Sequence, residues 1–263
     1  MKLQTSCKLI FDVSVATPFV LMLRPRSGSQ QWVEKDELRI IPEIPVYEFT
    51  DSYGNFCQRL VAQPGRISIH ARSTVNTADS ITREQGAPFI EVQDLPHEVL
   101  QYLLPSRYCE IEYFGQQAKD ITVNLKPGYD QVAAIEDWIR HNIYYSFSNS
   151  NSTVSAREVQ FRRSGVCRDL AHLGIALCRS LAIPARMVVG YLHELEPMDM
   201  HAWFEVFLAD RWFTFDATQP QLKNGYVVLG IGRDAADVAV YNQFGPPIFP
   251  VTQDVQIERI DET

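Results

Sequence analysis

Three residues of this chain could together perform nucleophilic chemistry: a cysteine, a histidine and an aspartate. Cys167 follows Gly165 and opens an apolar stretch that runs to Leu181. Apolar residues on nearly every face of this stretch predict a buried helix, and Cys167 falls in its first turn. The unpaired N–H groups and positive dipole end of a helix N-terminus favour a thiolate, which is the nucleophilic form of cysteine. Packing as a small buried hydrophobe is the common alternative for a cysteine.

His201 and Asp216 lie on two aromatic-rich segments, residues 200–208 and 211–217, which predict an antiparallel hairpin. If residues 209–210 form a short loop, His201 and Asp216 share one face of the hairpin, a diagonal step apart. Diagonal neighbours lie roughly 7–8 Å apart between backbones, within reach of these two side chains. A loop at residues 210–211 would keep both residues on the same face at a longer offset, so either register allows Asp216 to accept the predicted hydrogen bond from His201.

These three residues are the components of a thiol acyl-transfer site. Cys167 would attack a carbonyl carbon, and His201 would take the thiol proton and later protonate the leaving group. Asp216 would orient the imidazole and stabilise its cation. Each residue also has an ordinary structural role, such as a core hydrogen bond for a strand histidine or a turn cap for an aspartate. Their compatible geometry favours the catalytic interpretation.

Two other functions could use the same residues. Cys167, His201 and Asp216 could ligate zinc with water in the fourth position. No second His or Cys lies at close ligand spacing, and no EF-hand or paired-His motif occurs, so we expect neither a metal nor a cofactor. The chain could also be a non-catalytic binding module.

Composition and charge limit the class of protein. The 263 residues, 46% hydrophobic and 21% charged, suit a soluble protein of one large or two modest domains. The net charge of −8 argues against nucleic-acid or anionic-membrane partners, and no apolar run of about 20 residues predicts a membrane span. Five scattered cysteines favour reduced thiols. Because no signal-peptide core is recognisable, we expect a cytoplasmic location.

Hydrophobic periodicity divides the chain into two parts. Residues 7–15 and 67–75 alternate between apolar and polar, and residues 46–50 and 56–62 flank a turn-forming loop. Short strands joined by Gly/Pro turns predict an N-terminal β-sandwich domain over residues 1–98.

Residues 99–263 are predicted to form a catalytic domain of helices and antiparallel strands. Asp130 is expected to cap one helix, and Ser155 to cap a short helix through Phe161. Residues 186–191 predict a strand after the core helix. Strands first, then helices, then antiparallel strands indicate the α+β class.

Several segments resemble the bacterial transglutaminase-like proteins, which are often described as cysteine proteases. The segments are Gly-Val-Cys-Arg-Asp-Leu-Ala-His at 165–172, Ile-Pro-Ala-Arg at 183–186, His-Ala-Trp-Phe-Glu-Val at 201–206, Trp-Phe-Thr-Phe-Asp-Ala-Thr at 212–218, and residues 102–109 and 231–238. The resemblance implies a papain-like core after a transglutaminase-like β-domain. It also implies a peptide or protein substrate, with Cys167 as nucleophile, His201 as general base and acid, and Asp216 as orienting residue.

This chain departs from the animal transglutaminases, which carry Gly-Gln-Cys-Trp where residues 165–168 are Gly-Val-Cys-Arg and whose calcium sites have no counterpart here. Whether water or an amine resolves the thioester stays open. So does the second oxyanion donor beside the Cys167 N–H, since no motif aligns Gln160 with the glutamine of papain-type enzymes. Asp169 and His172 are expected to be structural partners of the core helix. The sequence does not indicate the oligomeric state.

Overall fold

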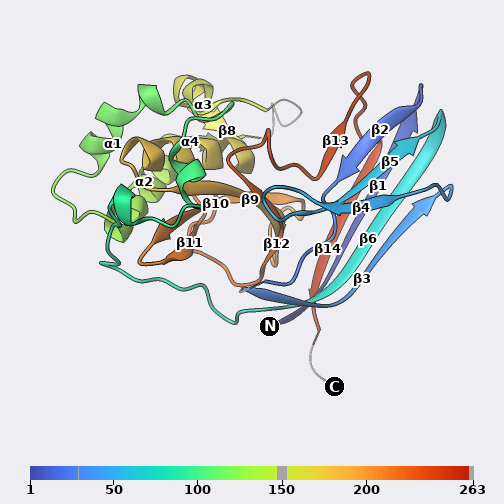
Figure 1. Cartoon of the computed structure of the whole chain (residues 1–263), viewed down its shortest axis with the longest axis horizontal. Helices are drawn as coiled ribbons and strands as arrows, with labels where there is room; N and C mark the ends of the chain where they lie inside the picture. Colours follow the sequence, from blue (N-terminus) through green and yellow to red (C-terminus); the bar gives the residue numbers. More distant parts are fainter. Residues whose placement is uncertain (29, 147–152, 261–263) are drawn as a thin grey trace.

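The structure is a computed structural model that describes residues 1–28, 30–146 and 153–260. Two parts lie next to each other, a β-sandwich and a sheet covered by helices (Figure 1). The predicted α+β class, with an N-terminal β-sandwich and helices packed on an antiparallel sheet, is confirmed. Within the described ranges, no helix is both long and apolar enough to cross a membrane.

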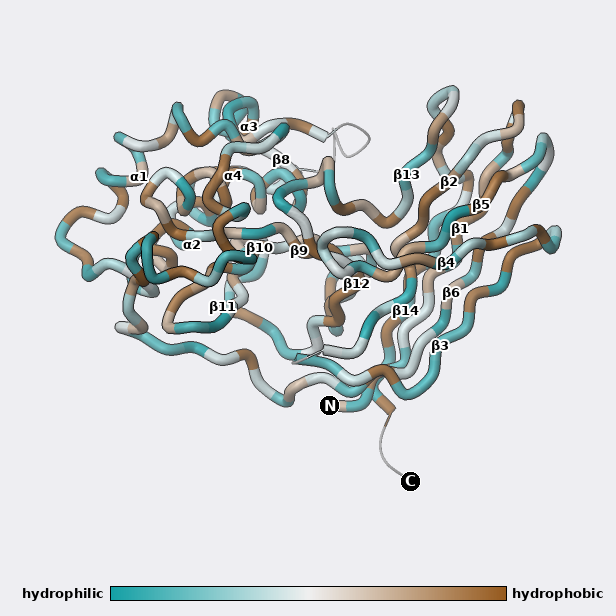
Figure 2. The backbone as a smooth tube through the Cα atoms, viewed as in Figure 1, coloured by the Kyte–Doolittle hydropathy of each residue, from teal (hydrophilic) through white to brown (hydrophobic). Residues whose placement is uncertain are grey.

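The β-sandwich consists of two antiparallel four-stranded sheets, with the orders β14-β1-β6-β3 and β13-β2-β5-β4. Its strands are β1 (Lys2–Val13), β2 (Thr17–Leu21), β3 (Gln31–Ile41), β4 (Tyr47–Thr50), β5 (Phe56–Ala62), β6 (Gly65–Thr77), β13 (Tyr241–Gln243) and β14 (Thr252–Arg259). Hydrophobic and hydrophilic residues alternate along these strands (Figure 2). The inward residues of both sheets form one core, in which the ring centroids of Phe11 and Phe19 lie 5.2 Å apart.

The C-terminal end of the chain completes the sandwich. β13 pairs with β2 and β14 pairs with β1, so the two ends of the chain meet in one sheet (Figure 1). Tyr191, Val227 and Leu229 from the second part are buried in the sandwich core. This shared core fixes the two parts relative to each other. The predicted domain boundary after residue 98 stays a prediction. Near its C-terminal end, at β13 and β14, the chain crosses back to the sandwich.

The second part is an antiparallel sheet of order β11-β10-β9-β12 with helices packed against it (Figure 1). The strands are β9 (Ala185–Leu192), β10 (His201–Leu208), β11 (Arg211–Phe215) and β12 (Tyr226–Gly232), with a small parallel pair of β7 (Tyr144–Tyr145) and β8 (Ser164–Gly165). The helices are α1 (Gly115–Ile121), α2 (Tyr129–Asn142), α3 (Ala156–Arg162) and α4 (Cys167–Ser180). Short 3₁₀ turns cover Val92–Asp94, Leu100–Leu103 and Ile111–Tyr113.

Helix α4 is the core of the second part. Every residue from Asp169 to Arg179 is buried, as the apolar spacing predicts. Gly174 allows α4 to approach β10, because a Cβ at this position would lie 2.6 Å from the Phe204 ring. Since close packing of this kind tolerates little movement, the contact fixes the N-terminus of α4 relative to the strand that carries His201.

The predicted hairpin between β10 and β11 is confirmed. Leu208 pairs with Arg211, which is the register expected for a loop at residues 209 and 210. Ala209 and Asp210 have φ angles of 47° and 60°, the left-handed conformation that a tight hairpin turn requires. This register places His201 and Asp216 on one face of the sheet.

One of the two predicted helix caps is confirmed. The Ser155 hydroxyl accepts a hydrogen bond from the N–H of Glu158 at the start of α3 (3.5 Å). The prediction that Asp130 caps α2 is wrong, because Gly128, with a φ of 117°, precedes the helix and Asp130 lies inside its first turn. The Asp130 carboxylate instead accepts a hydrogen bond from the N–H of Gly86 at 3.0 Å. This contact is distant in sequence, so local pattern could not predict it.

Candidate active site

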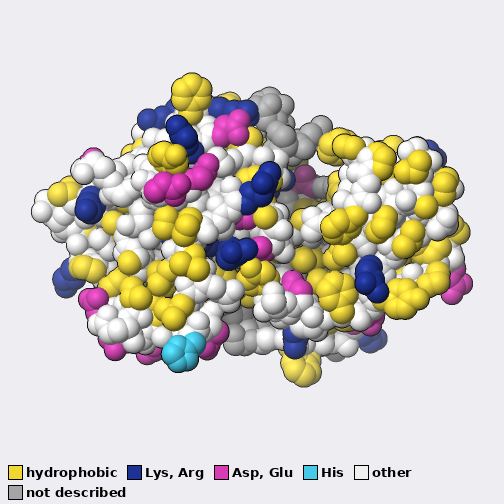
Figure 3. All heavy atoms as spheres, turned by 45° about the horizontal axis from the view of Figure 1, so that its top comes forward, with side chains coloured by type: hydrophobic (Ala, Val, Ile, Leu, Met, Phe, Trp, Pro, Cys, Tyr) yellow, Lys and Arg dark blue, Asp and Glu magenta, His cyan; other side chains and the backbone are white. Residues whose placement is uncertain are grey.

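A cleft of about 920 Å³ lies between the sandwich and the helical part. The space-filling view shows a hollow between these two parts (Figure 3). One wall of the cleft comes from the N-terminus of α4 and from β9 and β10, and the other comes from residues 235–253. Cys167 and His201 both line this cleft.

Cys167 is the first residue of α4, and its half-buried side chain faces the cleft. The turn before it is held by Asp169, whose carboxylate accepts a hydrogen bond from the N–H of Val166 at 3.1 Å. The N–H of Asp169 donates to the carbonyl of Val166 at 2.9 Å. Asp169 is 1% exposed and therefore serves as a structural partner of the turn, as predicted.

His201 begins β10, and its Nε2 atom lies 2.7 Å from Oδ2 of Asp216. The predicted hydrogen bond between these two side chains is confirmed. Asp216 Oδ1 accepts hydrogen bonds from the N–H and the hydroxyl of Thr218 at 3.0 and 2.6 Å, and Oδ2 accepts one from the Tyr226 hydroxyl at 2.8 Å. Burial disfavours charge on Asp216, but the charge and hydrogen bond of His201, with the two hydroxyls, lower its pKa below the ordinary value. The carboxylate is therefore ionised.

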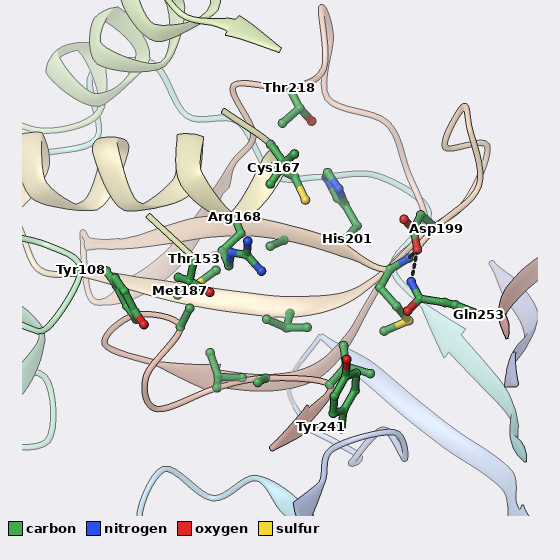
Figure 4. A pocket seen from close by; sticks show the side chains of 18 of the residues that line it. Tyr108, Thr153, Cys167, Arg168, Met187, Asp199, His201, Thr218, Tyr241 and Gln253 are labelled. Carbon is green, nitrogen blue, oxygen red and sulfur yellow. Dashed lines mark hydrogen bonds between the residues drawn. The ribbon is translucent and has the colours of Figure 1, made fainter. Parts of the chain in front are cut away.

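The thiol lies on the other side of the imidazole. The sulfur of Cys167 points toward the His201 ring (Figure 4), and the two side chains are hydrogen-bonded. Because Nε2 is bound to Asp216, Nδ1 is the ring nitrogen left for Cys167. Burial opposes protonation of His201, but the charge and hydrogen bond of Asp216, followed by those of Cys167, raise its pKa to about 10. A cationic imidazole therefore lies beside the sulfur at neutral pH.

Tyr145 is a further polar group at the thiol, and the sequence interpretation missed it. β7 pairs with β8, and the N–H of Ser146 donates to the carbonyl of Gly165 at 3.0 Å, which fixes Tyr145 beside the turn that leads to Cys167. The Tyr145 side chain lines the cleft, is 37% exposed, and is hydrogen-bonded to both the backbone and the side chain of Cys167. Burial first, and then the charge of Cys167, raise the pKa of Tyr145 above its ordinary value.

Comparison with known proteins assigns the family. Residues 115–217 match the profile of the transglutaminase-like superfamily, and residues 12–76 match the bacterial transglutaminase-like N-terminal region. A solved structure described as "a Putative Cysteine Protease from Cytophaga hutchinsonii" is 34% identical, with a TM-score of 0.92 over 100% of this chain and 92% of that chain. This chain belongs to the transglutaminase-like superfamily.

Curated relatives of this superfamily member occur in mycobacteria. An uncharacterized protein of Mycobacterium leprae (strain TN) is 28% identical over 234 residues, which cover 82% of each chain. An uncharacterized protein of Mycobacterium tuberculosis (strain ATCC 25618 / H37Rv) is 34% identical over 111 residues, or 36% of this chain and 35% of the other.

His172 connects the core helix of this transglutaminase-like protein to the opposite wall of the cleft. Its Nδ1 lies 3.0 Å from the carbonyl of Val154, and its Nε2 accepts a hydrogen bond from the N–H of Ala235 at 3.2 Å. The ring stacks on Tyr108 with centroids 5.1 Å apart. Complete burial lowers the pKa of His172 to about 4, so the ring is neutral and structural, as predicted.

Two other groups considered from the sequence lie outside this constellation. Gln160 is on α3 and is not among the residues that line the cleft. In the part of the chain that the structure describes, no three His, Cys, Asp or Glu side chains are grouped as a metal site requires.

Proposed function

We propose that this protein is a thiol-dependent acyl-transfer enzyme that acts on amide bonds of a peptide or protein. The observation that carries the proposal is the continuous relay from the Asp216 carboxylate through the His201 imidazole to the Cys167 thiol, at a helix N-terminus that faces a cleft. A carboxylate on one ring nitrogen and a thiol on the other is the arrangement that activates a sulfur nucleophile.

In the proposed reaction, the Cys167 sulfur attacks the amide carbon and forms an S–C bond. Its proton resides on His201 Nδ1, and Asp216 stabilises the imidazolium. His201 then donates this proton to the amide nitrogen, the C–N bond breaks, and the amine leaves a thioester on Cys167. Water or a second amine attacks the thioester, gives a proton to His201 and releases the acyl group with the thiol restored.

We also propose Tyr145 as the second donor to the oxyanion, beside the N–H of Cys167. The Tyr145 side chain is hydrogen-bonded to both the backbone and the side chain of Cys167 in the free protein. In this proposal the phenol lies beside the position that the carbonyl oxygen of the substrate enters. Because its side chain is 37% exposed to the cleft, it has room to move aside and donate its O–H to that oxygen. Losing one such donor costs about 10²–10³ in rate.

The proposal can be tested with intact-protein mass spectrometry after incubation with a library of peptidyl electrophiles that mimic amide carbonyls. We expect one label, located at Cys167 by peptide mapping, and no label in Cys167→Ser. His201→Ala is expected to abolish labelling while the protein stays folded. The proposal would be contradicted if no peptidyl probe labels Cys167 although iodoacetamide does, which is the result expected of a non-catalytic binding module.

A further inference from the structure

Charged side chains of both signs line the cleft around the Cys167–His201 pair. The cationic ones are Arg107 and Arg168, and the acidic ones are Glu196 and Asp199. In Figure 4, Arg168 lies on one side of the sulfur and the imidazole, and Asp199 lies on the other. Arg168 directly follows Cys167 on α4, and Asp199 shortly precedes His201.

The cationic end consists of Arg107, in the loop after Leu103, and Arg168, on α4. The Arg107 guanidinium is exposed and lies 5.4 Å from the centroid of the Tyr108 ring. Among the ion pairs of residues 1–28, 30–146 and 153–260, none joins a carboxylate to Arg107. The nearby carboxylate of Asp234 is fully buried and accepts the N–H groups of Tyr108 at 2.7 Å and Ala236 at 2.8 Å. Arg107 is therefore placed to bind a carboxylate from outside the chain.

Arg168 adds a second positive charge close to the sulfur. Its Nε lies 3.5 Å from Oδ1 of Asp169, and its side chain is 26% exposed. Because that carboxylate also accepts the N–H of Val166, its charge is shared between the turn and the guanidinium. Arg168 points into the cleft between Cys167 and Tyr108 (Figure 4). Because the Arg107 guanidinium lies against the Tyr108 ring, both positive charges lie on the Tyr108 side of the thiol.

The acidic end is held in place by the sandwich. Asp199 Oδ1 accepts hydrogen bonds from the N–H of Met200 at 2.7 Å and from the Gln253 side chain at 2.5 Å, the latter drawn in Figure 4. Glu196 is exposed at the same end of the loop before β10. Asp199 lies beyond the imidazole as seen from the thiol (Figure 4), so positive charge is favoured there.

Resting on the proposed function, we infer that the substrate amide joins an acyl group that carries a carboxylate to an amine that carries a positive charge. The reaction fixes the orientation, because the departing amine receives its proton from His201 and must lie on the imidazole side, toward Asp199. The acyl group bonded to the sulfur extends the other way, toward Arg168 and Arg107. An amide with the opposite charge order would place like charges together at both ends.

The acyl side is tested with two peptidyl fluoromethyl ketones that differ only in glutamate or glutamine beside the reactive carbon. We expect the glutamate probe to label Cys167 about five- to tenfold faster at low salt, and the difference to shrink at high salt. Arg107→Gln should remove most of the preference, and Arg107→Glu should reverse it. Arg66→Gln, which removes an exposed arginine of the sandwich, is the matched control and should change nothing.

Equal labelling by the two probes in the wild type would overturn the inference and leave the proposed function standing. So would a glutamate preference that survives both Arg107→Gln and Arg168→Gln. If neither probe labels Cys167 while iodoacetamide does, the proposed function itself fails.

The amine side is tested with the blocked dipeptides acetyl-Glu-Lys-amide and acetyl-Lys-Glu-amide, which share composition and have no net charge. Only the Glu-Lys order should be cleaved or should slow the alkylation of Cys167 by iodoacetamide. Asp199→Asn should weaken that effect severalfold. Equal effects of the two orders would contradict the inference.

Discussion

The Nε2 atom of His201 lies 2.7 Å from Oδ2 of Asp216, and neither side chain is more than 2% exposed. Thr218 and Tyr226 also donate hydroxyl hydrogen bonds to this carboxylate. The imidazole is thus held at one nitrogen by a fully satisfied anion, while the other nitrogen is left for Cys167. Because both side chains are buried, the imidazole is oriented by this carboxylate and not by water.

Replacing Asp216 by Asn should reduce labelling of Cys167 by a peptidyl carbonyl probe about 10³–10⁴-fold, because an amide neither stabilises the imidazolium nor selects the tautomer. The melting temperature should fall by no more than about 5 °C, since Asn keeps acceptor capacity for Thr218. Labelling rates and thermal unfolding would be measured together. Asp137→Asn, at a 62% exposed position on α2, is the matched control. Full labelling activity in Asp216→Asn would remove Asp216 from the relay.

Replacing Tyr145 by Phe should slow labelling by a peptidyl carbonyl probe about 10²-fold or more, because that reaction passes through an oxyanion. Alkylation of Cys167 by iodoacetamide forms no oxyanion, so its rate should change much less. Tyr144→Phe, at the adjacent and 75% exposed position, is the control and should behave as wild type in both assays. If Tyr145→Phe slows both reactions equally, the phenol acts on the thiol itself and not on the oxyanion.

The stability of the protein should fall in acid because of His172. Its pKa is lowered to about 4 in the folded state, against about 6.5 when unfolded, so the unfolded state binds more protons between these values. The free energy of unfolding should therefore decrease as the pH falls from about 6.5 through about 4, by about 3 kcal/mol. Urea unfolding at several pH values would measure this slope.

His172→Gln should flatten that pH dependence, because an amide can replace the ring as donor and acceptor without titrating. His141→Gln, which changes a 68% exposed histidine of α2, should leave the slope as it is in wild type. An unchanged slope in His172→Gln would assign the acid sensitivity to other groups.

The features that could be predicted from the sequence are those that depend on a local pattern of residues. The contact of His201 with Asp216 follows from a short hairpin whose register is set by the loop at Ala209 and Asp210. The burial of α4 follows from its apolar spacing. These relationships lie within one element or one turn, so periodicity is sufficient to find them.

The missed features depend on contacts between distant segments. Tyr145 reaches Cys167 because β7 pairs in parallel with β8. With only two residues, β7 is too short to leave a periodic pattern in the sequence. The aromatic pair Tyr144-Tyr145 upstream of the cysteine was the available signal. β13, with three residues, pairs with β2, and β14, with eight residues, pairs with β1. Because the paired strands lie at opposite ends of the sequence, local pattern could not assign β13 and β14 to the sandwich.

Four of the five cysteines serve as internal controls for the reactivity of Cys167. Burial raises the pKa of Cys7 to about 12, of Cys57 to about 11 and of Cys109 to about 12, and it also raises the pKa of Cys178. All four are buried, whereas Cys167 is half-buried and faces the cleft. They should be unreactive toward a polar alkylating reagent in the folded protein.

The most direct test is the rate of iodoacetamide alkylation at each cysteine between about pH 5 and 8, measured by peptide mapping in wild type and in His201→Ala. Because the pKa of His201 is raised to about 10, the imidazole carries its positive charge beside the sulfur throughout this range. Cys167 should therefore react much faster than the other four cysteines even at the acidic end, and His201→Ala should lose this reactivity below pH 7. An alkylation profile of Cys167 that is the same in wild type and His201→Ala would contradict the relay.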